Sequence, residues 1–274
     1  MRLLALAARV CRAFEQYTSD QTRMVQKVKG GQVRDVVTDL DLKLHSLSQD
    51  FVRECLEGAR LLSEEGGLAG ISAGDLLVGD WLVVDPLDGS NNYATGLPNY
   101  GYMAAHLRSG KVAGTVIVLP EQDQYIVTED GRTLFAQPLS QGRGRESRTV
   151  YYAYPPMQDA QARRARNALS EVIDTRAAGM YRHGSACVGL YQLLSGRHLA
   201  FVGHGIRVWD AIAFLPALAA QGLSVHYRLE GLTITLVAGS DPVFTDVLAS
   251  VLDSEQGLQL QRYDKSGTLM EFAH

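Results

Sequence analysis

The sequence has few cysteines, and they are poorly placed for cross-linking or metal binding. Its 274 residues include only three, Cys11, Cys55 and Cys187, which are far apart and show no Cys-x-x-Cys spacing. An odd, scattered set of this kind disfavours a disulfide framework and is typical of reduced thiols inside a cell. We therefore expect a cytoplasmic protein with free thiols.

Long apolar runs are also lacking. The first ten residues are mostly apolar, but Arg9 and Arg12 interrupt the run before it reaches the length of a signal-peptide core. No other run approaches the ~20 residues that a helix needs to cross a bilayer. Apolar residues instead recur at helical spacing from Leu3 to about Tyr17, which predicts an amphipathic first helix and no membrane partner.

Positive charge is not in excess, since 26 Lys and Arg face 30 Asp and Glu, for a net charge of −4. Two basic clusters, at residues 143–148 and 163–166, suit a solvated loop and an exposed helix face better than a polyanion site. We therefore expect no nucleic-acid polymer as partner. The polar, Gly- and Arg-rich stretch at residues 137–148 is the best candidate boundary between two subdomains, residues 1–140 and 141–274.

Several catalytic signatures are missing as well. There is no phosphate-binding loop ending in Gly-Lys-Ser/Thr, no nucleophile elbow and no His-Glu-x-x-His. The seven histidines show no paired spacing of metal ligands. These absences disfavour a P-loop nucleotidase, a serine hydrolase and a zinc peptidase.

What the chain does have is a short apolar run that ends in two acids. Trp81 to Val84 is rich in β-branched residues, which predicts a buried strand, and Asp85 and Asp88 follow it. The two acids should lie close together, because Pro86 fixes its own φ and Gly89 permits a sharp turn. Two carboxylates ~5 Å apart repel by roughly 3 kcal/mol at an effective dielectric of ~20. They therefore need a proton, a base or a cation, and a hard cation is the simplest answer.

The residues after the acids are suited to an anion. The backbone N–H groups of Gly89 and Ser90, with the Ser90 hydroxyl, can form an anion-holding turn beside the cation. A divalent cation next to an anion cradle indicates phosphate chemistry. The plainer interpretation is an ordinary surface turn, since Asp, Pro and Gly are common turn residues.

Residues 85–93, Asp-Pro-Leu-Asp-Gly-Ser-Asn-Asn-Tyr, resemble the signature of the inositol monophosphatase family, within the wider lithium-sensitive, magnesium-dependent sugar and nucleotide phosphatases. Four other elements appear in that family's order. They are Asp41 after Thr38, the Glu64-Glu65 pair, Gly184-Ser185-Ala186, and Trp209-Asp210. Helix capping is the plainer interpretation for Asp39 and Asp210. The resemblance covers nearly the whole chain.

The resemblance implies a metal site and a nucleophile. One Mg²⁺ would be held by Glu64, Asp85 and the Leu87 carbonyl, and a second by Asp85, Asp88 and Asp210. A third, weaker ion near Glu64 is also compatible with it. Ser90 and Asp41 would orient a metal-bound water, so the implied catalytic residues are Asp41, Glu64 and Ser90. The implied substrate contacts are Asp88, Gly89, Ser90, Gly184, Ser185, Ala186, Gly203, His204 and Arg207.

Two positions depart from the family pattern. Ser90 replaces the usual threonine and keeps its hydroxyl. Gly203 stands where inositol phosphatases place a glutamate that contacts substrate hydroxyls, and a lost polar contact of that kind changes specificity strongly. Gly203→Glu is therefore expected to raise activity on inositol phosphate. His204 and Arg207 lie near this position and could serve a different substrate, or be surface residues.

The resemblance also implies the fold and the activity. It implies an α/β (α+β) layered sandwich in αβαβα order, with an antiparallel sheet in the N-terminal half and a mixed sheet in the C-terminal half. We expect a homodimeric, Mg²⁺-dependent phosphomonoesterase acting on a small sugar, polyol or inositol-like phosphate. Alternatives are a 3′-phosphatase of adenosine bisphosphates and a non-catalytic, metal-binding homologue.

Local patterns predict the individual elements. Strands are expected at residues 102–107, 112–119, 125–127 and 149–154, helices at 42–56 and 157–174, buried helices opening at 183 and at 210, and a loop at 27–32.

Overall fold

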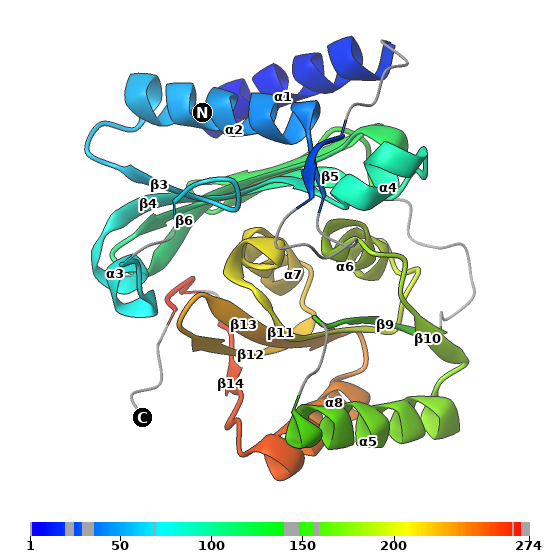
Figure 1. The fold of residues 1–274 in the computed structure, drawn as a ribbon. Helices are drawn as coiled ribbons and strands as arrows, with labels where there is room; N and C mark the ends of the chain where they lie inside the picture. Colours follow the sequence, from blue (N-terminus) through cyan, green and yellow to red (C-terminus); the bar gives the residue numbers. More distant parts are fainter. Residues whose placement is uncertain are drawn as a thin grey trace.

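The computed structural model describes residues 2–19, 25–28, 36–67, 70–139, 148–155, 159–264 and 266–269. Its elements stack as helices, sheet, helices, sheet, helices, as Figure 1 shows from top to bottom. The helical layers are the pairs α1 (Arg2–Ser19) and α2 (Asp39–Cys55), α6 (Ala186–Leu194) and α7 (Leu215–Ala220), and α5 (Ala160–Arg176) and α8 (Pro242–Gln256). The predicted αβαβα sandwich is confirmed.

The first sheet lies beneath α1 and α2. Its order is β3 (Arg60–Ser63), β4 (Asp80–Asp88), β5 (Gly101–Arg108), β6 (Lys111–Leu119), β7 (Gln124–Glu129) and β8 (Arg132–Phe135). It is antiparallel, as predicted, except at one edge, where β3 runs parallel to β4. A parallel pair needs a crossover, and α3 (Ala73–Val78) lies in this one.

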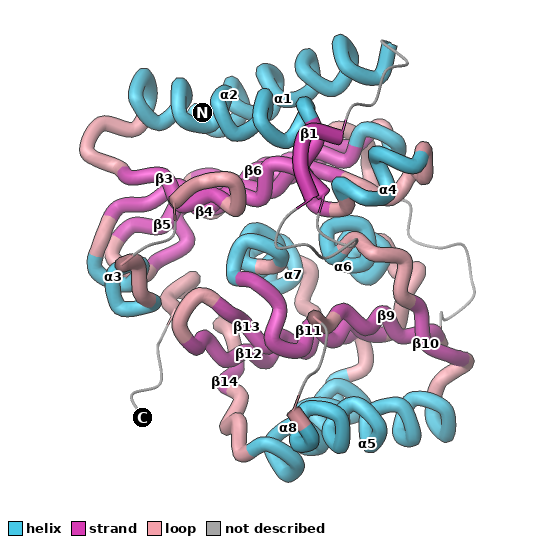
Figure 2. Tube along the Cα trace, in the orientation of Figure 1, coloured by secondary structure: helices cyan, strands magenta, loops and turns pink. Residues whose placement is uncertain are grey.

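The second sheet is mixed, as predicted. Its order is β10 (Gly179–Tyr181), β9 (Thr149–Ala153), β11 (Ala200–Arg207), β13 (Thr233–Gly239), β12 (Ser224–Glu230) and β14 (Gln261–Arg262). The pairs that β9 makes are parallel and the others are antiparallel. Figure 2 shows that α6 and α7 lie between this sheet and the first.

A short antiparallel ribbon, β1 (Val25–Val28) with β2 (Val36–Thr38), precedes α2. The loop expected at 27–32 is therefore corrected at Lys27 and Val28, which belong to β1, while 29–32 lie outside the described residues. The helix expected to begin at residue 42 begins at Asp39. Thr38 caps it in a capping box with Asp41, and the added first turn also buries Leu40, four residues before the buried Leu44.

Burial follows the layers. α1 buries a stripe that includes Leu3, Leu6 and Val10 against the first sheet, whereas α6 is buried almost all round because a sheet covers each side. All three cysteines are free thiols. No helix in the described part of the chain is both long and apolar enough to span a membrane.

Candidate functional site

The strand β4 delivers two acids to one end of the first sheet. Asp85 pairs with Met103 of β5 and Asp88 pairs with Gly101. Between these two pairs, β4 advances by three residues while β5 advances by two, so β4 contains one extra residue. This irregularity is a bulge, and it brings Asp85 and Asp88 to the same face of the sheet. The predicted closeness of the two acids thus comes from the pairing of β4.

Gly89 makes the sharp turn that follows. Its φ is +84°, in the left-handed region, and a Cβ there would lie 2.5 Å from the carbonyl oxygen of Asn99. Only glycine satisfies both conditions. The short helix α4 (Ser90–Thr95) begins at the next residue, which turns the Ser90 side chain back towards the acids.

Ser90 and Asp41 meet at this turn although 49 residues separate them. The Ser90 Oγ lies 2.7 Å from Asp41 Oδ1 and 2.7 Å from the Leu87 carbonyl oxygen, both of which can accept its proton. The other oxygen of Asp41 accepts from the Thr38 amide at 2.7 Å and the Thr38 hydroxyl at 2.5 Å. Burial raises the pKa of Asp41 to about 6, and the Thr38 and Ser90 hydrogen bonds oppose that rise.

Asp88 joins the first sheet to α6. Its Oδ2 accepts from the Ser185 hydroxyl at 2.5 Å and from the Cys187 amide at 2.6 Å. Burial raises the pKa of Asp88 to about 6, opposed by these bonds and by the amide of Ala186. The helix expected to open at 183 thus begins at Ala186 with Ser185 as its N-cap, and Gly184 precedes it with a φ of +80°.

Asp85 lies at the centre of the acids. It is 2% exposed, and its Oδ1 has no hydrogen-bond partner among the described residues. Its pKa is raised well above the ordinary value, first by burial and then by the charges of Glu64, Asp88, Asp210 and Asp41. Five carboxylates from different parts of the chain therefore act on one another.

Glu64 and Asp210 approach from opposite ends of the sequence. The amide of Glu64, just after β3, donates to the Val84 carbonyl at 3.2 Å, which seats it beside β4. Asp210 ends a 3₁₀ turn, Val208–Asp210, and accepts from the Arg207 amide at 3.1 Å. The helix expected to open at Asp210 instead begins at Leu215, so Asp210 is not its N-cap.

The carboxylate oxygens of these acids are the type of ligand that a hard divalent cation prefers. A buried carboxylate oxygen without a donor, surrounded by other carboxylates, is stabilised by a divalent cation with oxygen ligands. As they lie, no three His, Cys, Asp or Glu side chains in the described ranges form a closed ligand set. Both oxygens of Asp41 and one oxygen of Asp88 instead accept hydrogen bonds from donors of the chain.

A cavity of about 450 Å³ opens beside the acids. Of the predicted residues, its walls include Asp88, Asp210, Gly184, Ser185, Ala186 and Arg207. Sequence reasoning missed Tyr151, Tyr154, Arg182 and Ile206, which also line it. Of these residues, only Arg182 could have been predicted from the sequence, because it is a basic residue two positions before the Gly184-Ser185-Ala186 element.

The structure places His204 and Gly203 outside the walls of this cavity. His204 is 5% exposed, and its ring nitrogens contact the Tyr152 hydroxyl at 3.0 Å and the Gln256 side-chain oxygen of α8 at 2.7 Å. The ring thus faces the outer helices, and we do not retain it as a substrate contact. A Cβ at Gly203 would lie 2.7 Å from Ile206 Cδ1, so Ile206 occupies the space of a side chain at 203.

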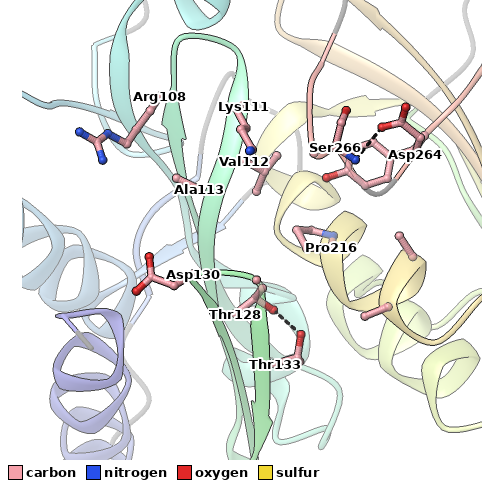
Figure 3. A pocket seen from close by; sticks show the side chains of 15 residues that line it. Arg108, Lys111, Val112, Ala113, Thr128, Asp130, Thr133, Pro216, Asp264 and Ser266 are labelled. Carbon is pink, nitrogen blue, oxygen red and sulfur yellow. Dashed lines mark hydrogen bonds between the residues drawn. The ribbon is translucent and has the colours of Figure 1, made fainter.

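A larger cavity, of about 730 Å³, lies elsewhere, between β6, β7 and α7 (Figure 3). Arg108, Lys111, Asp130 and Asp264 line it, but none of the five carboxylates described above does. Because Asp88 and Asp210 line the smaller cavity, we assign the candidate site to it in spite of its lower volume.

Comparison with known proteins identifies relatives over nearly the full length. The model of the inositol monophosphatase family matches residues 3–256. A "Nus factor SuhB" of Pseudomonas aeruginosa is 27% identical over 264 residues, which cover 91% of this chain and 95% of that protein. An "Inositol-1-monophosphatase" of Mycobacterium bovis is 28% identical over 244 residues, 82% of this chain and 80% of that one. A solved IMPase/NADP phosphatase complexed with Mg²⁺ and phosphate has the same fold, with a TM-score of 0.71 at 14% identity over 95% of this chain and 96% of that chain.

Proposed function

The chain belongs to the inositol monophosphatase family, and from this premise we propose that it is a Mg²⁺-dependent hydrolase of a small phosphate monoester. One observation carries the proposal. The buried, unpartnered Oδ1 of Asp85 lies among other carboxylates, beside a cavity of about 450 Å³. Such a cluster is costly to keep in a fold that makes no use of it.

The acids divide into two ligand groups in this proposal. Glu64, Asp85 and the Leu87 carbonyl would hold one Mg²⁺, and Asp85, Asp88 and Asp210 would hold another. The bound ions lower the pKa of coordinated water and neutralise phosphate charge. A solved relative in fold contains Mg²⁺ and phosphate, which supports the choice of metal. These ligand oxygens are sufficient for two ions. Measuring the number of Mg²⁺ ions bound per chain would reveal a third ion near Glu64.

Ser90 and Asp41 have a proton-handling role. With Ser90 Oγ 2.7 Å from Asp41 Oδ1, the hydroxyl can pass its proton to Asp41 while accepting one from the attacking water. Burial raises the pKa of Asp41 in the metal-free protein, which makes its carboxylate a better proton acceptor than an exposed aspartate. The water would attack phosphorus in line with the leaving oxygen, so that the ester P–O bond breaks as the new P–O bond forms. The departing alcohol oxygen would take up a proton from solvent, Asp41 would release its proton to solvent afterwards, and no covalent intermediate is needed.

Phosphate binding falls to the turn after β4. The amides of Gly89 and Ser90 follow the acids directly, and the left-handed conformation of Gly89 keeps the turn tight enough to present them. The Ser185 hydroxyl, which donates to Asp88, fixes the wall next to this turn. These groups position the phosphoryl group and exclude other orientations.

Phosphate release from a substrate panel tests the proposal. The panel holds inositol 1-phosphate, sugar phosphates, fructose 1,6-bisphosphate, histidinol phosphate and adenosine 3′,5′-bisphosphate, each with Mg²⁺, with EDTA, and with Mg²⁺ plus Li⁺. Mg²⁺-dependent release from a sugar or polyol phosphate is expected. Release confined to the bisphosphate nucleotide would instead support the 3′-phosphatase alternative, and metal binding without any release would support the non-catalytic one.

Gly203→Glu requires Ile206 to move, because a side chain at 203 enters its space. We expect the single variant to lose ~1–3 kcal/mol of stability through overpacking. Gly203→Glu with Ile206→Ala should recover part of that loss and gain more activity on inositol 1-phosphate than the single variant does. Thermal unfolding and kcat/KM for both variants check this. An unchanged Tm in the single variant would contradict the assignment of that space to Ile206.

We further propose a cytoplasmic homodimer of two-subdomain protomers. Three free thiols support the compartment. The first sheet is built from residues 60–135 and the second from 149–262, which supports a boundary near 140. The family supports the dimer, and light scattering after size exclusion tests it.

A further inference from the structure

The cavity beside the acids carries two cations, Arg182 and Arg207. Neither forms an ion pair with an acid in the part of the chain that the structure describes. Arg207 is nevertheless tied to the proposed metal ligand Asp210, since its amide donates to Asp210 Oδ2 at 3.1 Å and its guanidinium carbon lies 5.8 Å from the centre of the Trp209 ring. Among the described residues, Arg182, just after β10, is thus the cationic residue of this cavity that is neither paired with a carboxylate nor tied to a proposed metal ligand.

Arg182 is also held in place, although it is exposed. Its Nη2 donates to the Tyr154 carbonyl at 2.7 Å, and its guanidinium carbon lies 3.8 Å from the centre of the Tyr154 ring. Stacking and a hydrogen bond together fix a guanidinium that would otherwise sample many rotamers. Of its five N–H donors, one is used in this bond, which leaves an ordered fork of donors at the cavity wall.

The remaining walls offer few uncommitted polar groups to a ring of hydroxyls, since the wall hydroxyls of Ser185 and Thr233 already donate to Asp88 and to the Glu230 carbonyl. Ile206 fills the space where a side chain at 203 would lie, and Tyr151 is 1% exposed. Asp88 and Asp210 are the acids among the lining residues, and both belong to the proposed metal site. Selectivity for the alcohol part of a substrate must therefore come from apolar contact and from the fixed cation.

We propose that Arg182, supported by Tyr154, binds a second anionic group on the alcohol part of the substrate, either a carboxylate or a further phosphate. The inference rests on the proposed phosphatase activity and names the substrate class of that site. A planar guanidinium binds both groups with two parallel N–H···O bonds. Among small phosphate monoesters, the preferred substrate is thus one whose alcohol part carries a second, separate anionic group.

Matched substrate pairs test this. Phenyl phosphate is compared with 3-carboxyphenyl phosphate, and glycerol 3-phosphate with 3-phosphoglycerate, so that each pair differs by one carboxylate. The expected kcat/KM is roughly tenfold or more higher for the carboxylated member, since a hydrogen-bonded charge contributes that much. Arg182→Gln should bring the ratio close to one, mainly through KM, and Arg182→Lys should give an intermediate ratio. Arg164→Gln, an exposed arginine of α5, should leave the ratio unchanged.

The outcomes separate the two proposals. If no compound of these pairs or of the substrate panel releases phosphate with Mg²⁺, the phosphatase proposal itself fails. If phosphate is released equally from both members and Arg182→Gln changes nothing, the phosphatase proposal stands and the role of Arg182 is overturned. Should Arg182→Gln fold poorly by thermal unfolding, Arg182→Lys carries the test, because it keeps the charge and removes the fork.

Discussion

Asp85→Asn is expected to lower kcat/KM by roughly a thousandfold or more, because Asp85 is shared by both proposed ions and outer-shell partners of a metal alone are worth ~10–100-fold. The stability of the metal-free variant, in contrast, should not fall. Asp85 is buried among other acids, so removing its charge relieves repulsion in the metal-free protein. We expect the Tm in EDTA to stay level or rise, while the rise in Tm on adding Mg²⁺ disappears.

Asp174→Asn is the matched control, since Asp174 is exposed on α5 and does not line the cavity beside the acids. It should behave as the wild type in both assays. Near-normal turnover in Asp85→Asn would contradict the metal assignment, and a large fall in its metal-free Tm would mean that Asp85 has a structural role.

The second large effect is a pH dependence of stabilisation by Mg²⁺. Without metal, burial raises the pKa of Asp88 to about 6 and raises the pKa values of Asp85 and Asp210 well above 3.8, so these proposed ligands bind protons at low pH, in competition with a cation. As the pH rises they ionise and repel one another until an ion binds. At 100 times Kd a ligand adds ~2.7 kcal/mol, which is ~5–10 °C in Tm for a chain of this size. We expect that rise at pH 7.5 and at most about a third of it at pH 5.

The increment on adding Mg²⁺ is the appropriate quantity, because the Tm in EDTA mixes opposing contributions. A carboxyl with a raised pKa binds more protons in the folded state, so it removes stability as the pH rises from about 4 to 6. The imidazole of His198, whose pKa burial lowers to about 4, removes stability as the pH falls from 6.5. Equal increments at the two pH values, measured by calorimetry, would show that the acids do not bind the metal.

Much of the fold follows from local patterns. The run from Trp81 to Val84 is apolar and β-branched, and it forms the central part of β4 as predicted. The parallel placement of β3 was not predictable in this way, because it depends on the path of the crossover through α3. The start of α2 was placed three residues late, because a capping box of Thr38 with Asp41 sets that end, and the buried Leu40 alone does not distinguish the end of a strand from the first turn of a helix.

The site illustrates the same limit. The acids were predictable as a set through the family resemblance, and their roles stay predictions. Their contacts were not, because partners such as Asp88 and Ser185 lie 97 residues apart in the chain. His204 was expected to contact the substrate because it is next to Gly203 in the sequence. Its ring instead contacts Gln256 of α8, which lies 52 residues further along the chain and could not be identified as its partner from the sequence. Arg182 gains its interest from Tyr154, which sequence spacing does not connect to it.

The most direct test of the metal site is diffraction from crystals grown with Mn²⁺ and phosphate, recorded at a wavelength where manganese scatters anomalously. The account predicts anomalous peaks within coordination distance of Asp85, shared with Glu64 on one side and with Asp88 and Asp210 on the other, and phosphate beside Ser90. A cluster without manganese at saturating Mn²⁺, or manganese bound only elsewhere, would contradict it.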